Sequence, residues 1–109
     1  MSREVVATPV FARHLTAFLD GYAEKGAVRF LDRLERSYVA MLDHLEEFED
    51  LGRARRRTIG GKTVTAREYV LEAGARDFLV LYVVPAEPDD PIVLLNIRSG
   101  GPNRFRWKE

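Results

Sequence analysis

Asp77-Phe-Leu-Val-Leu-Tyr-Val-Val84 is an unbroken hydrophobic run in which seven of the eight residues are apolar. A strand with one face in water would alternate apolar and polar residues, so this run predicts a strand that is buried on both faces. Such a strand needs a neighbour on each edge and cover above and below. We therefore expect residues 77–84 to form the central strand of a sheet.

The segments on either side of this run predict its neighbours. Val64 to Glu72 has the character of a strand, and Ala73-Gly-Ala-Arg76 is the turn that leads from it into the central strand. The acidic segment 85–91 contains three prolines, which exclude regular structure, and Ile92 to Ile97 forms the last strand. Ile59-Gly-Gly-Lys62 predicts a tight two-residue turn, because glycine tolerates the positive φ that such a turn requires.

The first half of the chain predicts a short strand followed by two helices. Arg3 to Ala7 is the strand candidate. Thr8 and Pro9 mark the start of the first helix, because Thr is a good N-cap and Pro suits the first helical position. Glu24-Lys-Gly26 separates the two helices, and Gly52 is the expected C-terminal stop of the second.

Both helices carry an apolar stripe at helical spacing. In the first helix the stripe consists of Phe11, Leu15, Phe18 and Tyr22. In the second helix it consists of Phe30, Leu34, Tyr38, Met41, Leu45 and Phe48. Asp32 and Arg36 stand four residues apart on the charged face and predict an ion pair. The simplest interpretation of both stripes is that they form the core.

The order of elements is therefore β-α-α-β-β-β within a single domain of residues 1–109. Strands joined by consecutive turns pair antiparallel, and two helices joined by a short break are antiparallel neighbours. We predict an α+β, two-layer fold in which the N-terminal helical hairpin packs on a small antiparallel sheet.

The composition excludes several classes of protein. No apolar run approaches the roughly 20 residues that span a membrane, and the start of the chain has no signal-peptide core, so we expect a cytoplasmic location. Zero cysteines exclude disulfides and thiolate chemistry. The two histidines, His14 and His44, are too few for most metal sites. We expect neither a metal nor another cofactor.

The net charge of zero conceals an asymmetry between the two halves of the chain. Residues 1–52 carry 6 basic and 10 acidic side chains, whereas residues 53–109 carry 11 basic and 7 acidic ones. An anionic target would therefore meet the C-terminal half. The densest cluster, at Arg53, Arg55, Arg56 and Arg57, is either a solvated loop or a surface that steers the protein toward an anion.

Several short pieces, in a set order along nearly the whole chain, carry a family resemblance. They are Val5-Val-Ala-Thr-Pro-Val-Phe11, Gly26-Ala-Val-Arg-Phe-Leu-Asp-Arg-Leu34, Leu51-Gly-Arg53, Arg67-Glu-Tyr-Val-Leu71, the strand that closes on Tyr82, and the final strand that ends in Arg98. In this order and spacing they resemble the RelE/ParE superfamily of bacterial toxins from type II toxin–antitoxin modules. The resemblance implies a small toxin that arrests growth and is held inactive by a cognate antitoxin, which lays a C-terminal segment across it.

The two branches of this superfamily differ in their target. ParE-like members poison DNA gyrase, whereas RelE-like members cleave mRNA on the ribosome. RelE-like toxins tend to carry an Arg in the strand before the conserved Tyr, and here Phe78-Leu-Val-Leu81 has none. They also place a Tyr or His near the C-terminus, where this chain has Phe105 and Trp107. The resemblance thus favours gyrase, with a ribosome-dependent endoribonuclease as the alternative and a non-toxic binding module as the third possibility.

Two sets of residues are candidates for binding macromolecules, and no small-molecule substrate is expected. For the target, they are the basic and aromatic residues of the tail 98–109 and the arginine cluster, namely Arg98, Arg104, Arg106, Trp107, Lys108, Arg55, Arg56 and Arg57. For the antitoxin, they are Phe11, Leu15, Phe18 and Tyr22. Alternatively, Trp107 and this apolar stripe complete the core. Glu68 and Tyr69 are the best acid/base pair, but a surface Glu and a core Tyr explain them equally well, so we assign no catalytic residue.

Overall fold

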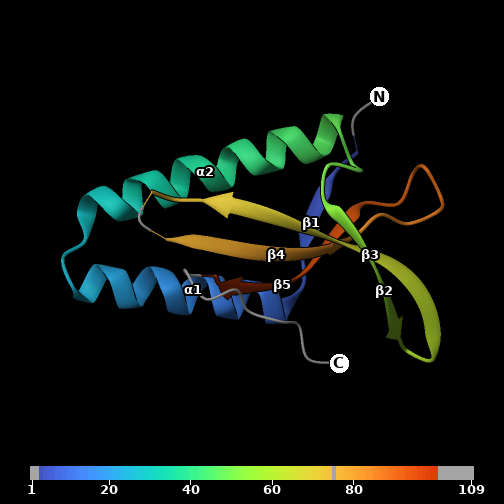
Figure 1. Cartoon of the computed structure of the whole chain (residues 1–109), viewed down its shortest axis with the longest axis horizontal. Helices are drawn as coiled ribbons and strands as arrows, with labels where there is room; N and C mark the ends of the chain where they lie inside the picture. The colour runs from blue at the N-terminus through green and yellow to red at the C-terminus, as the bar shows by residue number, and fades with distance from the viewer. Residues whose placement is uncertain (1–2, 75, 101–109) are drawn as a thin grey trace.

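The computed structural model of the chain describes residues 3–74 and 76–100. It contains two helices and a five-stranded sheet, which confirms the α+β class and the N-terminal helical hairpin (Figure 1). The strands lie in the order β1-β5-β4-β3-β2. In chain order the elements are β1 (Val5–Ala7), α1 (Pro9–Glu24), α2 (Val28–Glu47), β2 (Arg53–Ile59), β3 (Lys62–Glu72), β4 (Asp77–Val83) and β5 (Ile92–Ser99).

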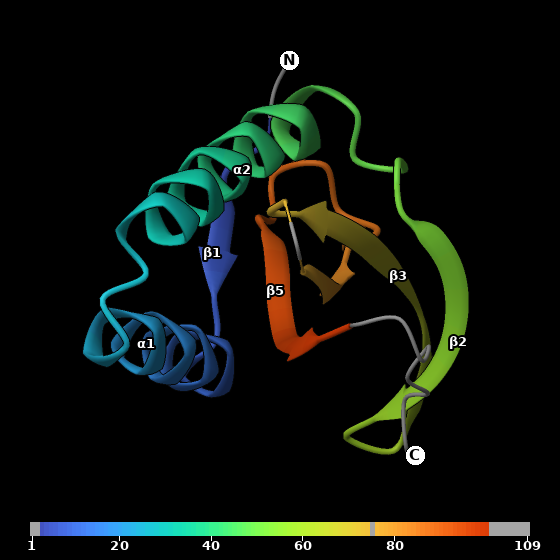
Figure 2. The same ribbon diagram turned by 60° about the vertical axis from the view of Figure 1, so that its left-hand side comes forward.

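The hydrophobic run at residues 77–84 provides the middle strand of the sheet, as its composition predicts. Phe78, Val80 and Tyr82 of β4 are completely buried against the helices. Leu79 and Leu81 point to the other face, where Leu79 is half-buried and Leu81 is buried. Both helices lie on the same side of the sheet, so that neither covers this second face (Figure 2). The expectation of cover on both faces of the central strand is therefore wrong, because its helical cover comes from one side only.

The helices form where the local signals place them. The backbone N–H of Phe11 donates to Thr8 Oγ1 at 3.1 Å, which caps α1, and Pro9 occupies the first turn. Gly26 has a φ of 69°, the left-handed conformation that lets the chain turn between the helices. The expected pair of Asp32 and Arg36 is present at 3.1 Å.

The prediction for Gly52 is wrong. Helix α2 ends at Glu47, where the N–H of Phe48 bonds to the carbonyl of His44, so Gly52 lies beyond the helix. Gly52 is required for a different reason. A Cβ atom at this position would lie 2.7 Å from Tyr82 Cε1 and 2.8 Å from the carbonyl oxygen of Glu68. Only a residue without a side chain allows this close approach.

The arginine cluster forms a strand, so its interpretation as a solvated loop is wrong. Gly60 and Gly61 have φ values of 57° and 79° and form the predicted tight turn, which brings Ile59 opposite Lys62. The turn thereby folds residues 53–59 back along β3 as a fifth strand. Charged residues such as Arg53 and Arg56 on an edge strand discourage pairing with another chain.

The N-terminal strand also differs from the expectation of a purely antiparallel sheet. β1 pairs with β5 in parallel, with Val5 opposite Ile92 and Ala7 opposite Leu94. The remaining neighbours are antiparallel, as expected for strands on consecutive turns. β1 and β5 are the first and last strands, so the whole chain between them forms the long connection that a parallel pair requires. The sheet is therefore mixed.

Candidate functional site

The two outer strands are shorter than the strands beside them, and this leaves two stretches of sheet edge unpaired. β1 pairs only with residues 92–94 of β5, so among the described residues no strand pairs with the later part of β5 on that side. β2 pairs with β3 only as far as Glu68, so residues 69–72 are also open on one side. An unpaired edge presents backbone N–H and C=O groups that can pair with an extended segment of another chain.

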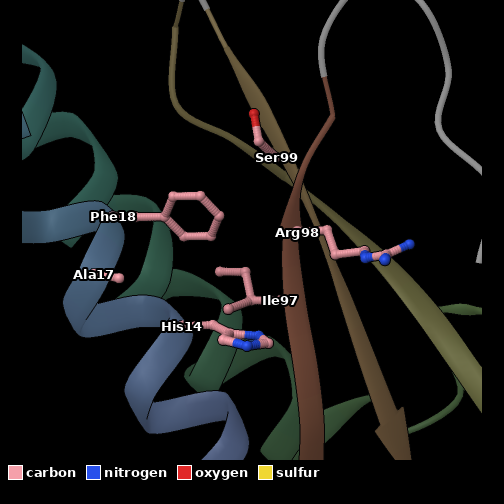
Figure 3. Close-up of a pocket in the computed structure, with 6 residues that line it drawn as sticks. All are labelled: His14, Ala17, Phe18, Ile97, Arg98 and Ser99. Carbon is pink, nitrogen blue, oxygen red and sulfur yellow. The ribbon is translucent and has the colours of Figure 1, made fainter. Parts of the chain in front are cut away.

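A shallow hollow of about 420 Å³ lies between α1 and the open part of β5. His14, Ala17 and Phe18 of α1 line one side, and Ile97, Arg98 and Ser99 line the other. Figure 3 shows Ile97 directed toward α1, whereas Arg98 points to the opposite side of β5. The hollow is thus mainly apolar, with the His14 ring at one end.

The backbone of β5 alternates between its two edges. The N–H of Gly100 donates to the carbonyl of Asp77 at 2.7 Å, so residues 98 and 100 direct their backbone groups toward β4. Ile97 and Ser99 therefore direct theirs toward the open edge. A bulge opposite Leu81 and Tyr82 inserts one extra residue into β5, and it allows Leu94 and Ile97 both to be buried.

Side chains of the protein itself bond to part of this edge. Thr8 Oγ1 donates to the carbonyl of Leu95 at 3.2 Å. The N–H of Ile97 donates to Asn96 Oδ1 at 2.9 Å, and His14 Nδ1 lies 2.6 Å from the same oxygen. Because an amide oxygen only accepts, His14 must donate through Nδ1–H. Sequence reasoning missed this arrangement, since His14 and Asn96 are 82 residues apart.

The second open edge lies beside α2. A hollow of about 300 Å³ is lined by Ser37 and Ala40 of α2 and by residues 69–72 of β3. Ser37 Oγ donates to the carbonyl of Glu72 at 2.6 Å. Val70 of β3 also lies on this edge, and its side chain is 52% exposed. This edge therefore offers one exposed apolar side chain and is closed at its end by a helix hydroxyl.

The face of the sheet away from the helices carries charged side chains. Glu68 of β3 is only 8% exposed and lies beside Leu81 on β4 and Arg53 on β2. Arg98 of β5 is paired with Leu79, on the same face. Tyr69 points to the helix side, where its hydroxyl lies 3.3 Å from His44 Nδ1. Glu68 and Tyr69 therefore lie on opposite faces and do not act together as an acid/base pair.

No histidine or tyrosine among residues 3–74 and 76–100 lies on that second face. His14, Tyr22, Tyr38 and His44 belong to the two helices, whereas Tyr69 and Tyr82 point from the sheet toward them. Proton transfer near neutral pH most often uses His, and Tyr is one of its substitutes. The chemistry that the second face offers through its described residues is that of a carboxylate and arginines.

Three residues that carry the family resemblance meet at one end of the sheet. The buried hydroxyl of Tyr82 accepts from the N–H of Gly52 at 2.8 Å and donates to the carbonyl of Glu49 at 2.9 Å. Arg67 Nη1 donates to the carbonyls of Asp50 and Gly52 at 3.1 and 2.8 Å. Burial raises the pKa of Tyr82, although the bond from Gly52 and the charge of Arg67 oppose this. Together these contacts attach the α2–β2 connection to the central strand.

Arg3 attaches the neighbouring segments at the same end. Its side chain is 12% exposed, and its Nε lies 2.7 Å from Glu49 Oε2. Its Nη1 donates to the carbonyls of Pro85, Glu87 and Asp90 in the proline-containing loop. One guanidinium thus joins the segment before β1, the α2–β2 connection and the β4–β5 connection.

The structure separates the residues proposed to bind the antitoxin. Phe11 is completely buried, with its ring stacked 6.2 Å from that of Tyr38, and so belongs to the core. Leu15, Phe18 and Tyr22 are half-buried and pack against the core. Of these four, Phe18 lines the hollow beside β5. Phe11 therefore offers no surface to a partner in this conformation.

The residues proposed to bind the target come from different parts of the fold. Arg55, Arg56 and Arg57 belong to β2, and Arg98 belongs to β5, which β3 and β4 separate from β2 in the sheet. The other proposed residues lie outside the described part of the chain, and they are Arg104, Arg106, Trp107 and Lys108. No three His, Asp or Glu side chains among residues 3–74 and 76–100 are grouped as metal ligands, and neither helix described here is long and hydrophobic enough to cross a bilayer.

Comparisons of the chain with protein families, with curated proteins and with solved structures find no match. Membership of the RelE/ParE superfamily therefore stays a prediction. It depends on the sequence pieces quoted above and on their order along the chain.

Proposed function

We propose that this protein is the toxin of a type II toxin–antitoxin module and that a cognate antitoxin holds it inactive. The observation that carries the proposal is the ordered set of sequence pieces that resemble the RelE/ParE superfamily. The way they fold is consistent with it, because Gly52, Arg67 and Tyr82 come from three of these pieces and converge on one hydrogen-bonded cluster. These contacts give a structural reason for three sequence pieces that are far apart in the chain to occur together.

The antitoxin, in this proposal, binds in the hollow between α1 and β5. An extended segment can pair with the outward backbone of Ser99 and, once it displaces Asn96 Oδ1, with that of Ile97. An apolar side chain can fill the space between Phe18 and Ile97. This placement is on the helix side of β5, whereas Arg98 points the other way (Figure 3). The antitoxin and the target thus have separate surfaces available to them.

The toxin, in this proposal, acts by binding DNA gyrase. RNA cleavage through a 2′-hydroxyl needs one group to take a proton and another to return it. Tyr82 is buried, and no His or Tyr in the described part of the chain lies on the second face with Glu68 and Arg98. A binding mechanism needs no such pair. The presence of a carboxylate and arginines on one face keeps the ribosome-dependent endoribonuclease as the second candidate.

Expression without antitoxin, followed by assays on the purified protein, tests this function. Growth should stop, and the protein should inhibit gyrase in a supercoiling assay. Full supercoiling at excess protein, together with codon-positioned cuts in cellular mRNA by primer extension, would favour the endoribonuclease. Unchanged colony counts would instead favour a non-toxic binding module. Removing residues 104–109 should abolish toxicity but preserve antitoxin binding, because we assign those residues to the target.

The antitoxin surface has its own test. Ala17 is exposed and lines the hollow, so Ala17→Arg fills the space without removing a core side chain. This variant should stay toxic and should escape neutralisation by the co-expressed antitoxin. Ala23→Arg is the matched control, because Ala23 is also exposed on α1 but does not line the hollow. Normal neutralisation of the Ala17 variant would place the antitoxin elsewhere.

A further inference from the structure

We propose that Asn96 is a removable cap on the open edge of β5, which prevents two copies of this chain from pairing edge to edge. Its Oδ1 accepts the N–H of Ile97, which is a donor that an added strand would use. The cap itself follows from the geometry of this chain alone. Its displacement by an antitoxin strand rests on the proposed function.

The position of this bond makes it a substitute for a neighbouring strand. Gly100 bonds toward β4, so the alternation along β5 directs the N–H of Ile97 outward, to the side where β1 has already ended. A neighbouring strand would offer a carbonyl oxygen to this N–H. The amide oxygen of Asn96 provides the same acceptor from within the chain.

His14 holds the cap in place. Its Nδ1–H donates to the oxygen that already accepts from Ile97, at 2.6 Å. The two donors come from α1 and β5, so the side chain of Asn96 is oriented from both sides of the hollow. A cap held from one side only would rotate away more readily, because an exposed amide exchanges its partners with water at little cost.

Side-chain hydrogen bonds to the backbone occur at two other places on the sheet edges. Thr8 Oγ1 donates to the carbonyl of Leu95 on β5, and Ser37 Oγ donates to the carbonyl of Glu72 on β3. Each bond lies where an outer strand has ended and an inner strand continues. Natural sheets commonly block such edges against association. Asn96 differs from the other two, because it blocks a backbone donor.

The occupant that the cap excludes is the β5 edge of a second copy. Ile97 and Ser99 both direct backbone groups outward, so two such edges related by a two-fold axis can offer donors and acceptors to each other. The hollow beside the edge is apolar and shallow, which would let the second copy approach. Removing the cap should therefore lead to self-association.

The experiment compares Asn96→Ala with Asn96→Asp in the full-length chain. The Asp variant keeps an oxygen for Ile97 and His14, whereas the Ala variant has none. Hydrogen exchange by NMR should be about tenfold faster for the Ile97 amide in the Ala variant, as expected for the loss of one hydrogen bond, and near the wild-type rate in the Asp variant. Unchanged exchange at Val80, opposite Ile97 on β4, confirms that the sheet is intact.

Sedimentation velocity then measures the association. The Ala variant should form dimers at concentrations where the wild-type and Asp proteins are monomers. Adding Ser99→Pro to the Ala variant removes the next outward donor and should restore the monomer. Equal exchange rates for the Ile97 amide in all three proteins would refute the proposal that Asn96 caps this N–H. A monomeric Ala variant, or a dimer that survives Ser99→Pro, overturns its role at this edge. None of these results depends on whether the protein is toxic.

Discussion

Replacing Tyr82 with phenylalanine removes one hydrogen-bonded oxygen atom from the core of the fold. The ring is completely buried on the central strand, and its hydroxyl bonds to the backbone of Gly52 and Glu49. Phenylalanine preserves the ring and its packing. The variant therefore isolates the two hydrogen bonds that attach the α2–β2 connection to the sheet.

The two bonds contribute unequally. The N–H of Gly52 is buried, and a buried donor that loses its acceptor costs about 1–3 kcal/mol. The carbonyl of Glu49 is only partly buried, so water can replace the hydroxyl there and the loss is about 1 kcal/mol or less. Removing a polar atom from the core returns about 1 kcal/mol. The net expectation is a loss of about 2 kcal/mol in the free energy of unfolding, or a fall in Tm of about 8 °C.

Urea denaturation followed by circular dichroism measures this change. Tyr38→Phe is the matched control, because Tyr38 also packs against the core but its hydroxyl makes no hydrogen bond to any residue in the described part of the chain. Its unfolding free energy should change by no more than about 0.5 kcal/mol. If Tyr82→Phe is no less stable than Tyr38→Phe, then the hydroxyl does not hold the connection, and this account of the cluster is refuted.

Three further predictions concern the same end of the molecule and the tyrosines. Gly52→Ala should lower the unfolding free energy by about 2 kcal/mol or more, because its Cβ would lie within 2.8 Å of Tyr82 and of a backbone carbonyl; a variant of wild-type stability in urea would contradict this. Arg3→Met should lower the unfolding free energy by about 2 kcal/mol, because it removes the bonds to Glu49 and to three carbonyls. Arg36→Met is the control and should lower it by at most about 0.5 kcal/mol, because the Arg36 side chain in its ion pair is 79% exposed. Equal losses in the two variants would refute this difference. Burial raises the pKa of Tyr38, Tyr69 and Tyr82 above that of the unfolded chain. The contribution of these three tyrosines to stability should therefore be constant below about pH 10 and fall above it, because unfolding then releases protons. A urea midpoint that does not fall above about pH 10 would exclude this.

The sequence alone determined the elements whose signals are local. Thr8 and Pro9 start α1 because an N-cap needs only the residues of one turn. Gly60 and Gly61 form a turn because both adopt positive φ. The hydrophobic run at residues 77–84 predicts a central strand, because an apolar strand without alternation requires a neighbouring strand on each edge, whatever the order of those strands. The class and the helical hairpin follow from these signals.

The tertiary structure decided which residues meet. Residues 53–59 look like a loop because their arginines give no period, yet pairing with β3 makes them a strand. Phe11 and Phe18 belong to one stripe, but the first is completely buried and the second lines a hollow. The cap formed by Asn96 and His14 depends on where β1 ends relative to β5. Such features depend on the relative lengths of strands that are distant in sequence, and no local pattern encodes them.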